Sequence, residues 1–292
     1  MHMSTGFAVI NSASNPFQLA KTDGEKFTAI DGIENLSLLL QLNLSEIKNR
    51  FEKTNHEISG KLIAPIAADS EVWGAGVTYL RSKDARKEES GVPDVYQRVY
   101  EAERPEIFFK SIGNKVVADQ ANIGIRADAA TSVPEPEVAI VINKFREIIG
   151  LTICNDVTSR NIEGENPLYL PQAKMYYGSC ALGPIIKPIW QIKNLSGLKI
   201  SAQITRGKQV VWQAQTSLAA LNRKFEELVE FLFRCQSFPN GAILSTGTGI
   251  VPPMDISLLP DDVVTIEVEE IGLLTNKVAQ IPLDLNERLS AK

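Results

Sequence analysis

Two glutamates stand two positions apart where an apolar strand is expected to begin, in residues 133–140, VPEPEVAI. Residues i and i+2 of a strand point to the same face, so Glu135 and Glu137 can converge on one hard cation. A third carboxylate, Asp156, follows a predicted strand over 148–154. Three carboxylates suit Mg²⁺, Mn²⁺ or Ca²⁺. On these residues alone, the alternative is that the glutamates line a solvated edge and that Asp156 caps a turn.

Histidine is scarce, because the chain contains only His2 and His56. A zinc site of the HExxH type is therefore excluded. A Ser-His-Asp triad or a Cys-His pair would have to use His56 as its base, and no GxSxG sequence lies near it. Any catalytic chemistry must therefore use carboxylates, lysine, arginine, tyrosine and a metal.

Two further stretches carry polar groups that a site could use. Lys174 lies in residues 165–178 among prolines, apolar residues and three tyrosines, where a lysine is either a surface residue or a functional cation. Residues 245–249, STGTG, offer hydroxyl groups and backbone amides that can bind a carboxylate, although such turns are common.

The composition is that of a mildly acidic globular protein. The chain has 292 residues, 44% of them hydrophobic, and a formal charge of −5 from 30 basic and 35 acidic residues. Without basic clusters, nucleic acid is not an expected partner. No apolar run is long enough to span a membrane and no signal segment is evident, so we expect a cytoplasmic protein with no membrane partner. We expect the cysteines to be buried thiols, because Cys154, Cys180 and Cys235 show no CxxC spacing.

Short apolar and alternating runs predict a β-rich fold of the α+β class with mixed strands. The expected strands cover 6–10, 107–110, 138–142, 148–153, 185–189, 200–205 and 263–268. Helices are expected at 45–53, 81–89 and 218–235, the last from leucines at helical spacing. We expect a small N-terminal α/β domain at 1–68 and a catalytic domain at 69–292.

An ordered set of motifs resembles the fumarylacetoacetate hydrolase superfamily over about residues 70–285. The set comprises Val72–Tyr79 (VWGAGVTY), Pro105–Lys110 (PEIFFK), Glu135–Glu137, Asn155–Arg160 (NDVTSR), Lys174, Leu182–Pro184 and Ser245–Thr248. The resemblance implies mixed β-sheets rolled around the site and a homodimer or homotetramer. It also implies a divalent cation, Mg²⁺ with Mn²⁺ or Ca²⁺ as alternatives, on Glu135, Glu137 and Asp156.

One departure from the family pattern bears on the reaction. Hydrolases of this family usually carry a histidine that activates water after the Gly-x-x-Tyr segment, and Ser82 stands there in this chain. A neutral serine is no general base near pH 7 without a partner. The sequence Val77-Thr78-Tyr79, together with residues 165–174 (ENPLYLPQAK), resembles the sugar-acid dehydratases of the family. This implies dehydration of 2-keto-3-deoxy-D-arabinonate, or a related 2-keto-3-deoxy sugar acid, to 2,5-dioxopentanoate through a metal-stabilised enolate.

Individual residues can be given expected roles, and the resemblance supplies one of them. Lys174 matches the active-site lysine of the family and would stabilise the enolate or the substrate carboxylate. Glu106 precedes an apolar run and is our candidate for the proton-transfer carboxylate, with an exposed strand-start glutamate as the alternative. Substrate contacts are expected from Tyr79, Arg81, Ser82, Arg160 and Thr246.

Three rival functions stay open at this point. The first is hydrolysis of acylpyruvates or diketo acids at a carbon–carbon bond with another base in place of the histidine. The second is a dehydratase that forms a Schiff base on Lys174. The third is a non-catalytic metabolite-binding protein, against which the intact set of carboxylates argues.

Overall fold

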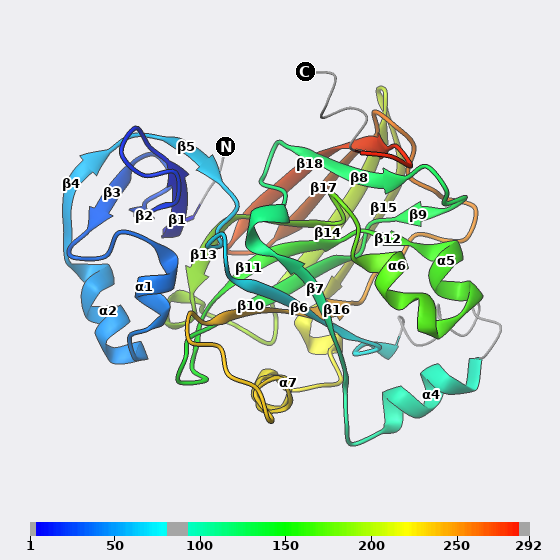
Figure 1. Ribbon diagram of the computed structural model, residues 1–292, viewed down its shortest axis with the longest axis horizontal. Helices are drawn as coiled ribbons and strands as arrows, with labels where there is room; N and C mark the ends of the chain where they lie inside the picture. The colour runs from blue at the N-terminus through cyan, green and yellow to red at the C-terminus, as the bar shows by residue number, and fades with distance from the viewer. Residues whose placement is uncertain (1–3, 81–92, 286–292) are drawn as a thin grey trace.

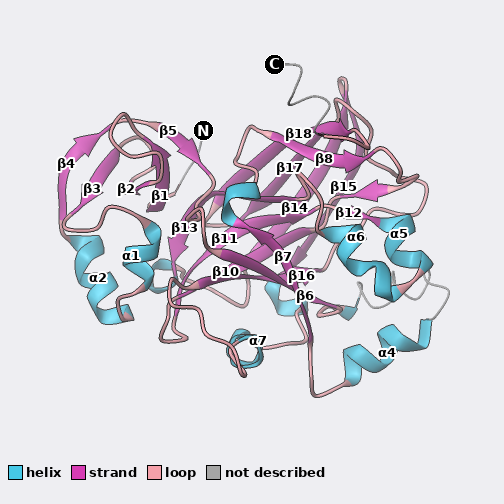
Figure 2. Cartoon of the chain, viewed as in Figure 1, coloured by secondary structure: helices cyan, strands magenta, loops and turns pink. Residues whose placement is uncertain are grey.

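Strands dominate the regular structure in the computed structural model, which describes residues 4–80 and 93–285 (Figure 1). Figure 2 shows strands from the left side of the molecule through its centre, with most helices along its lower and right sides. The α+β, β-rich fold expected from the sequence is therefore confirmed. Within the described ranges, no helix is long and apolar enough to cross a membrane.

The N-terminal residues form a small antiparallel sheet beside two helices. Its strands are β1 (Gly6–Asn11), β2 (Gln18–Thr22), β3 (Phe27–Ile30), β4 (Thr54–Ile58) and β5 (Lys61–Ile63). Helix α1 (Leu36–Leu40) precedes α2 (Leu44–Glu52), which the sequence predicts at 45–53. A capping box between Asn43 and Glu46 fixes the start of α2, and Ile47 and Phe51 are buried on its inner face.

These strands continue into a large mixed sheet. Its eleven strands run in the order β4-β3-β2-β1-β13-β11-β10-β16-β6-β7, with β5 beside β1. The remaining members are β6 (Glu71–Gly76), β7 (Glu106–Ile112), β10 (Pro136–Ile142), β11 (Ile148–Asp156), β13 (Cys180–Pro188) and β16 (Ala242–Thr248). Because β1 pairs with β13 at Phe7 and Ile186, the N-terminal strands share a sheet with the rest of the chain. The division at residue 68 stays a prediction.

A second sheet packs on the first. It has five strands in the order β15 (Gln209–Ser217), β14 (Lys199–Arg206), β17 (Val263–Val268), β18 (Gly272–Ile281) and β8 (Asn122–Arg126). The strand predicted at 263–268 is observed as β17, and it alternates, since Val264, Ile266 and Val268 are buried and the residues between them are more exposed. These side chains share one apolar core with residues of the large sheet such as Ile140 and Leu151. The two sheets are therefore held together by a common core.

Short elements lie beyond the ends of strands of the large sheet. A two-stranded pair joins β9 (Ser132–Val133) and β12 (Thr158–Ser159), and helices α4 (Pro93–Glu101), α5 (Arg160–Glu165) and α6 (Leu170–Lys174) lie on the same side of the molecule (Figure 1). Short 3₁₀ turns cover Gly113–Lys115, Pro167–Tyr169, Ile189–Gln191 and Leu218–Ala220. The segment from α5 to α6 therefore connects β12 to β13.

The helix predicted at 218–235 is wrong in its first half. Helix α7 covers only Phe225–Leu232. Before it, Leu221 forms a β-bridge with Tyr79, and the Asn222 amide donates to the Thr78 carbonyl over 2.9 Å. This strand-like pairing competes with helix formation although the leucine spacing is helical. The helix predicted at 81–89 lies outside the described residues.

The cysteines depart from expectation at one position. Cys154 and Cys180 are buried free thiols, as predicted, whereas Cys235 is free but exposed. Cys235 follows α7 with a positive φ of 56°, in a turn that leads out of the helix. A surface turn at this point explains why the third thiol is not in the core.

Candidate active site

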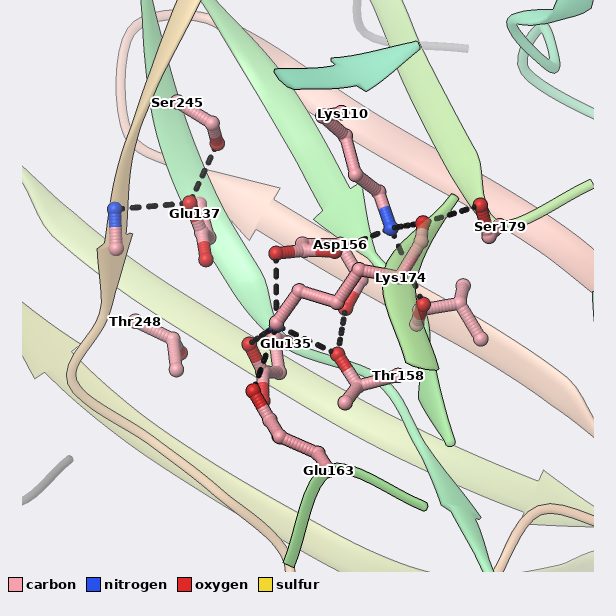
Figure 3. Close-up of polar contacts among 12 residues, drawn as sticks. Lys110, Glu135, Glu137, Asp156, Thr158, Glu163, Lys174, Ser179, Ser245 and Thr248 are labelled. Atoms are coloured by element: carbon pink, nitrogen blue, oxygen red, sulfur yellow. Dashed lines mark hydrogen bonds and ion pairs between the residues drawn. The ribbon is translucent and has the colours of Figure 1, made fainter. Parts of the chain in front are cut away.

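Three acidic side chains from two paired strands meet in the interior (Figure 3). Glu135 directly precedes β10, Glu137 lies within it, and Asp156 is the last residue of β11. The Asp156 amide donates to the Glu135 carbonyl over 3.0 Å, which holds the two strand ends together. One ligand oxygen from each carboxylate lies within 4.8 Å of the others, and each residue is 2% exposed. The structure thus brings together the three residues predicted to bind metal.

The Glu137 carboxylate is held by the end of β16. It accepts hydrogen bonds from the Ser245 hydroxyl and, over 2.8 Å, from the Gly247 amide. Gly247 has a φ of +87°, and a Cβ there would lie 2.0 Å from the Thr78 hydroxyl oxygen, so glycine is required. Burial raises the pKa of Glu137 well above its usual value, and the nearby Asp156 and Glu135 charges raise it further. The surroundings of Glu137 therefore disfavour its charged form.

Lys174 reaches this cluster from the last residue of α6. Its Nζ donates to Glu135 Oε2 over 2.8 Å, to Asp156 Oδ2 over 3.0 Å and to the Thr158 hydroxyl over 2.8 Å. The Lys174 side chain is 3% exposed, and Glu163 Oε1 lies 3.8 Å from its Nζ. The three protons of an ammonium group match these three hydrogen-bond acceptors. Lys174 is thereby fixed with its charge beside the carboxylates.

A second buried lysine, Lys110 of β7, lies behind the first. Its side chain is fully buried and forms an ion pair with Asp156 Oδ1. Its Nζ also donates to the backbone carbonyls of Lys174 over 2.5 Å and Val157 over 3.2 Å. Lys110 therefore joins a carboxylate of β11 to the backbone of the catalytic candidate Lys174. The sequence included Lys110 in a family motif without indicating this role.

The carboxylates open into a narrow space that we call the inner cavity, bordered by Glu106, Lys174 and the carboxylate trio. Its volume is about 20 Å³, room for about one water molecule. Val77 also borders it, with a φ of +53° that is rare for a β-branched residue. Backbone strain of this kind concentrates at functional sites. Glu106, the predicted proton-transfer residue, is thus placed in the same cavity as the carboxylates.

A larger space, the outer cavity, adjoins the inner one. It has a volume of about 300 Å³ and shares Tyr96, Glu106 and Glu163 with the inner cavity. Its other walls are mainly apolar and come from α4 and from the segment between α5 and α6, including Val99 and Leu170. A small molecule bound at the carboxylates would extend in this direction.

The described residues that were predicted to contact substrate lie near the inner cavity without lining it. Tyr79 is buried against Gly249, and burial together with Glu137 raises its pKa. Arg160 donates to the Pro252 carbonyl over 2.9 Å, and the Thr246 hydroxyl donates to the Val138 carbonyl over 2.8 Å. None of these three side chains lines the inner cavity. Arg81 and Ser82 lie outside the described residues.

Other residues of the site had no assigned function in the sequence. Thr248, two positions after Thr246, borders the inner cavity, and Gly247 supplies an amide to Glu137. The predicted carboxylate-binding turn at 245–249 therefore binds a carboxylate of the protein itself. Glu163 had no signal beyond its place between two family motifs.

Comparison with known proteins gives a consistent result. The family model described as fumarylacetoacetate (FAA) hydrolase C-terminal matches residues 71–279. A probable 2-keto-3-deoxyxylonate dehydratase of Haloferax volcanii is 43% identical over 217 residues, 74% of each chain. A 2-dehydro-3-deoxy-D-arabinonate dehydratase of Saccharolobus solfataricus is 38% identical over 253 residues, 85% of this chain and 80% of that one.

Solved structures agree with the sequence relatives. One described as 2-keto-3-deoxy-D-arabinonate dehydratase complexed with magnesium and 2,5-dioxopentanoate superposes with a TM-score of 0.81 at 32% identity. The match covers 95% of this chain and 99% of that one. The family model covers well over half of the chain, including both strands that carry the carboxylates. The chain therefore belongs to the fumarylacetoacetate hydrolase family.

Proposed function

We propose that this protein is a hydro-lyase that dehydrates 2-keto-3-deoxy-D-arabinonate, or a related 2-keto-3-deoxy sugar acid, to 2,5-dioxopentanoate. The observation that carries the proposal is the buried set of Glu135, Glu137 and Asp156 with Lys174 and Glu106 in one cavity. The names of two relatives that are 43% and 38% identical support the same reaction.

We propose Mg²⁺ as the cofactor, with Mn²⁺ or Ca²⁺ as alternatives, held by Glu135, Glu137 and Asp156. The donors fit, because all are carboxylate oxygens, which hard cations prefer. Charge also fits, since five carboxyl groups but one lysine line the described part of the inner cavity. When bound, such a cation supplies Lewis-acid polarisation of a 2-keto acid.

The side chains of the protein would bind the substrate and move protons. Glu106 would accept a proton from C3, and the electron pair of that bond would form the C2–C3 double bond of an enolate. The enolate would then re-form the C2 carbonyl, and the C3–C4 double bond would form as the C4–oxygen bond breaks. The hydroxyl group leaves as water, and further proton transfers along the remaining chain give the aldehyde. The Lys174 ammonium, already desolvated and oriented, would stabilise the negative charge that develops on the C2 oxygen.

The rival functions receive less support from the geometry. Hydrolysis would need an activated water, and the histidine that the structure describes, His56, lies on β4 in the N-terminal sheet. A Schiff base on Lys174 would need a neutral amine. The two ion pairs with Glu135 and Asp156 favour the ammonium form, which has no free electron pair. Borohydride trapping would detect the Schiff base, and product analysis would detect hydrolysis.

The proposed reaction is tested by incubating the protein with 2-keto-3-deoxy-D-arabinonate and Mg²⁺ and measuring 2,5-dioxopentanoate. Turnover is expected to disappear after complete chelation and to return when Mg²⁺ is added. Turnover that survives metal removal would contradict the cation requirement. Failure to act on this acid and on its C4 epimer would contradict the proposed substrate class.

The role of Glu106 is tested by Glu106→Gln, which keeps the shape but removes the base. We expect kcat to fall by about 10²–10⁴-fold, the usual contribution of a general base, with little change in cation affinity. The exposed Glu103→Gln, three residues earlier, is the matched control. Full activity of Glu106→Gln would assign the proton transfer to another group.

Two finer predictions accompany this proposal. We propose that the protein is a homodimer or homotetramer, which light scattering of the purified protein would measure. We also propose a cytoplasmic location, which fractionation of the source cells would test.

A further inference from the structure

Glu163 is a buried carboxylate of the site that the proposed reaction has so far left without a role. It lies on α5, its side chain is 5% exposed, and its Oε1 lies 3.8 Å from Lys174 Nζ. It is not a member of the carboxylate trio that could hold a cation. Figure 3 shows its side chain pointing from α5 toward Lys174 and Glu135. A carboxylate so far from solvent is costly unless a partner or a function retains it.

The position of Glu163 relative to both cavities defines what it can reach. Together with Glu106 and Tyr96, it borders the inner and the outer cavity. The inner cavity holds only about 20 Å³, so a substrate anchored at the carboxylates would extend past these shared residues toward the outer cavity. The carbons next to the keto-acid end, C3 and C4, would therefore lie beside Glu106 and Glu163.

Dehydration requires two proton transfers at these two carbons. One proton leaves C3, and another must reach the C4 hydroxyl group, because hydroxide is a poor leaving group. We propose that Glu163 is a catalytic residue that delivers the second proton, while Glu106 removes the first; this inference rests on the dehydration proposed above.

The proposed step is balanced. The C3–H bond breaks, its proton passes to Glu106, and the electron pair forms the C2–C3 double bond of an enolate. The enolate then re-forms the C2 carbonyl, and the C3–C4 double bond forms as the C4–oxygen bond breaks. The leaving oxygen takes its electron pair and the Glu163 proton, and departs as water. The Glu163 carboxylate is left beside the Lys174 ammonium, 3.8 Å away in the structure, which stabilises the negative charge.

The test separates proton removal from loss of water in Glu163→Gln. Wild-type protein and variant are incubated with 2-keto-3-deoxy-D-arabinonate and Mg²⁺ in heavy water. Proton NMR then follows deuterium uptake at C3 of the remaining substrate, and 2,5-dioxopentanoate is measured in parallel. We expect product formation by the variant to fall by about 10²–10⁴-fold. The recovered substrate is expected to carry deuterium at C3, because removal and return of that proton continue.

A better leaving group supplies a second readout. The substrate analogue with fluorine in place of the C4 hydroxyl needs less protonation, so Glu163→Gln should eliminate fluoride within about tenfold of the wild-type rate. Glu163→Asp, which keeps the acid, should recover part of the lost activity on the natural substrate. Glu165→Gln, an exposed glutamate at the end of the same helix, should behave as wild type.

Each contrary result has a distinct meaning. One contrary result is an equal fall in C3 exchange and in product formation, with no recovery of the elimination rate on the fluorinated analogue. It would show that Glu163 only positions Lys174 and would overturn the inference. Activity of Glu163→Gln equal to that of Glu165→Gln would also overturn it. Absence of turnover by the wild-type protein would instead remove the proposed dehydration, and this inference with it.

Discussion

Replacement of Lys174 by methionine is expected to lower kcat by about 10³-fold, the effect of removing a preorganised charge next to developing negative charge. Lys174 is the only basic residue among the described residues that line the inner cavity. Its ammonium is already held by Glu135, Asp156 and Thr158, so little reorganisation is needed during the reaction. Steady-state kinetics at saturating Mg²⁺ would measure the loss.

The same substitution has a second consequence, for stability. Removing one partner of a buried ion pair leaves an uncompensated charge and costs about 3–5 kcal/mol. Lys174→Met should therefore unfold at a lower temperature without cation, and Mg²⁺ should raise its melting temperature more than that of the wild type. Lys187→Met removes another mostly buried lysine, outside the described site, and should keep normal turnover. Activity of Lys174→Met within about tenfold of wild type would contradict its assigned role.

The substitution Glu137→Gln is expected to weaken Mg²⁺ binding by about 100-fold or more and to lower turnover by about 10³-fold, because hard cations bind charged carboxylates far better than amides. The amide oxygen can still accept from Ser245 and Gly247, so the backbone around the site should be preserved. Calorimetric titration with Mg²⁺ measures the affinity. Glu267→Gln, an exposed position on β17, is the control.

Removal of this charge should stabilise the protein in the absence of cation. The pKa of Glu137 is raised in the folded state by burial and by its acidic neighbours. Its contribution to folding stability is therefore complete below the unfolded-state pKa of 4.5 and is lost as the pH rises through the folded-state value. Above that range, metal-free Glu137→Gln should melt higher than the metal-free wild type, and the difference should vanish in acid. Unchanged Mg²⁺ affinity would remove Glu137 from the proposed ligand set.

The three carboxylates of the proposed cation site could be predicted from strand periodicity. Glu135 and Glu137 share a face because side chains alternate along β10, and Asp156 ends the run of apolar residues in β11. Periodicity within each strand gives no information on which strands pair. The register that sets Glu137 opposite Cys154, and hence near Asp156, depends on packing of the whole sheet.

The predicted substrate contacts show that local sequence patterns do not determine the partners of a side chain. Regular strand alternation would place Thr246 and Thr248 of β16 on one face. Gly247 between them has a positive φ, however, and the two side chains face different surroundings. Arg160 looks like a ligand for a carboxylate, but it binds backbone carbonyls from a segment about 90 positions away. The roles of Lys110 and Glu163 likewise depend on their contacts with Lys174, which lies far from Lys110 in the sequence, so local patterns did not predict them.

The segment from α5 to α6 has a practical consequence for enzyme engineering. The carboxylate trio is attached to the central sheet, whereas much of the outer cavity is formed by this segment and by α4. Mutant libraries at Val99, Pro167 and Leu170 would reshape that wall without altering any strand or any hydrogen bond of the carboxylates. Selection for new substrates can thus begin from these three codons, with the reactive centre left as it is.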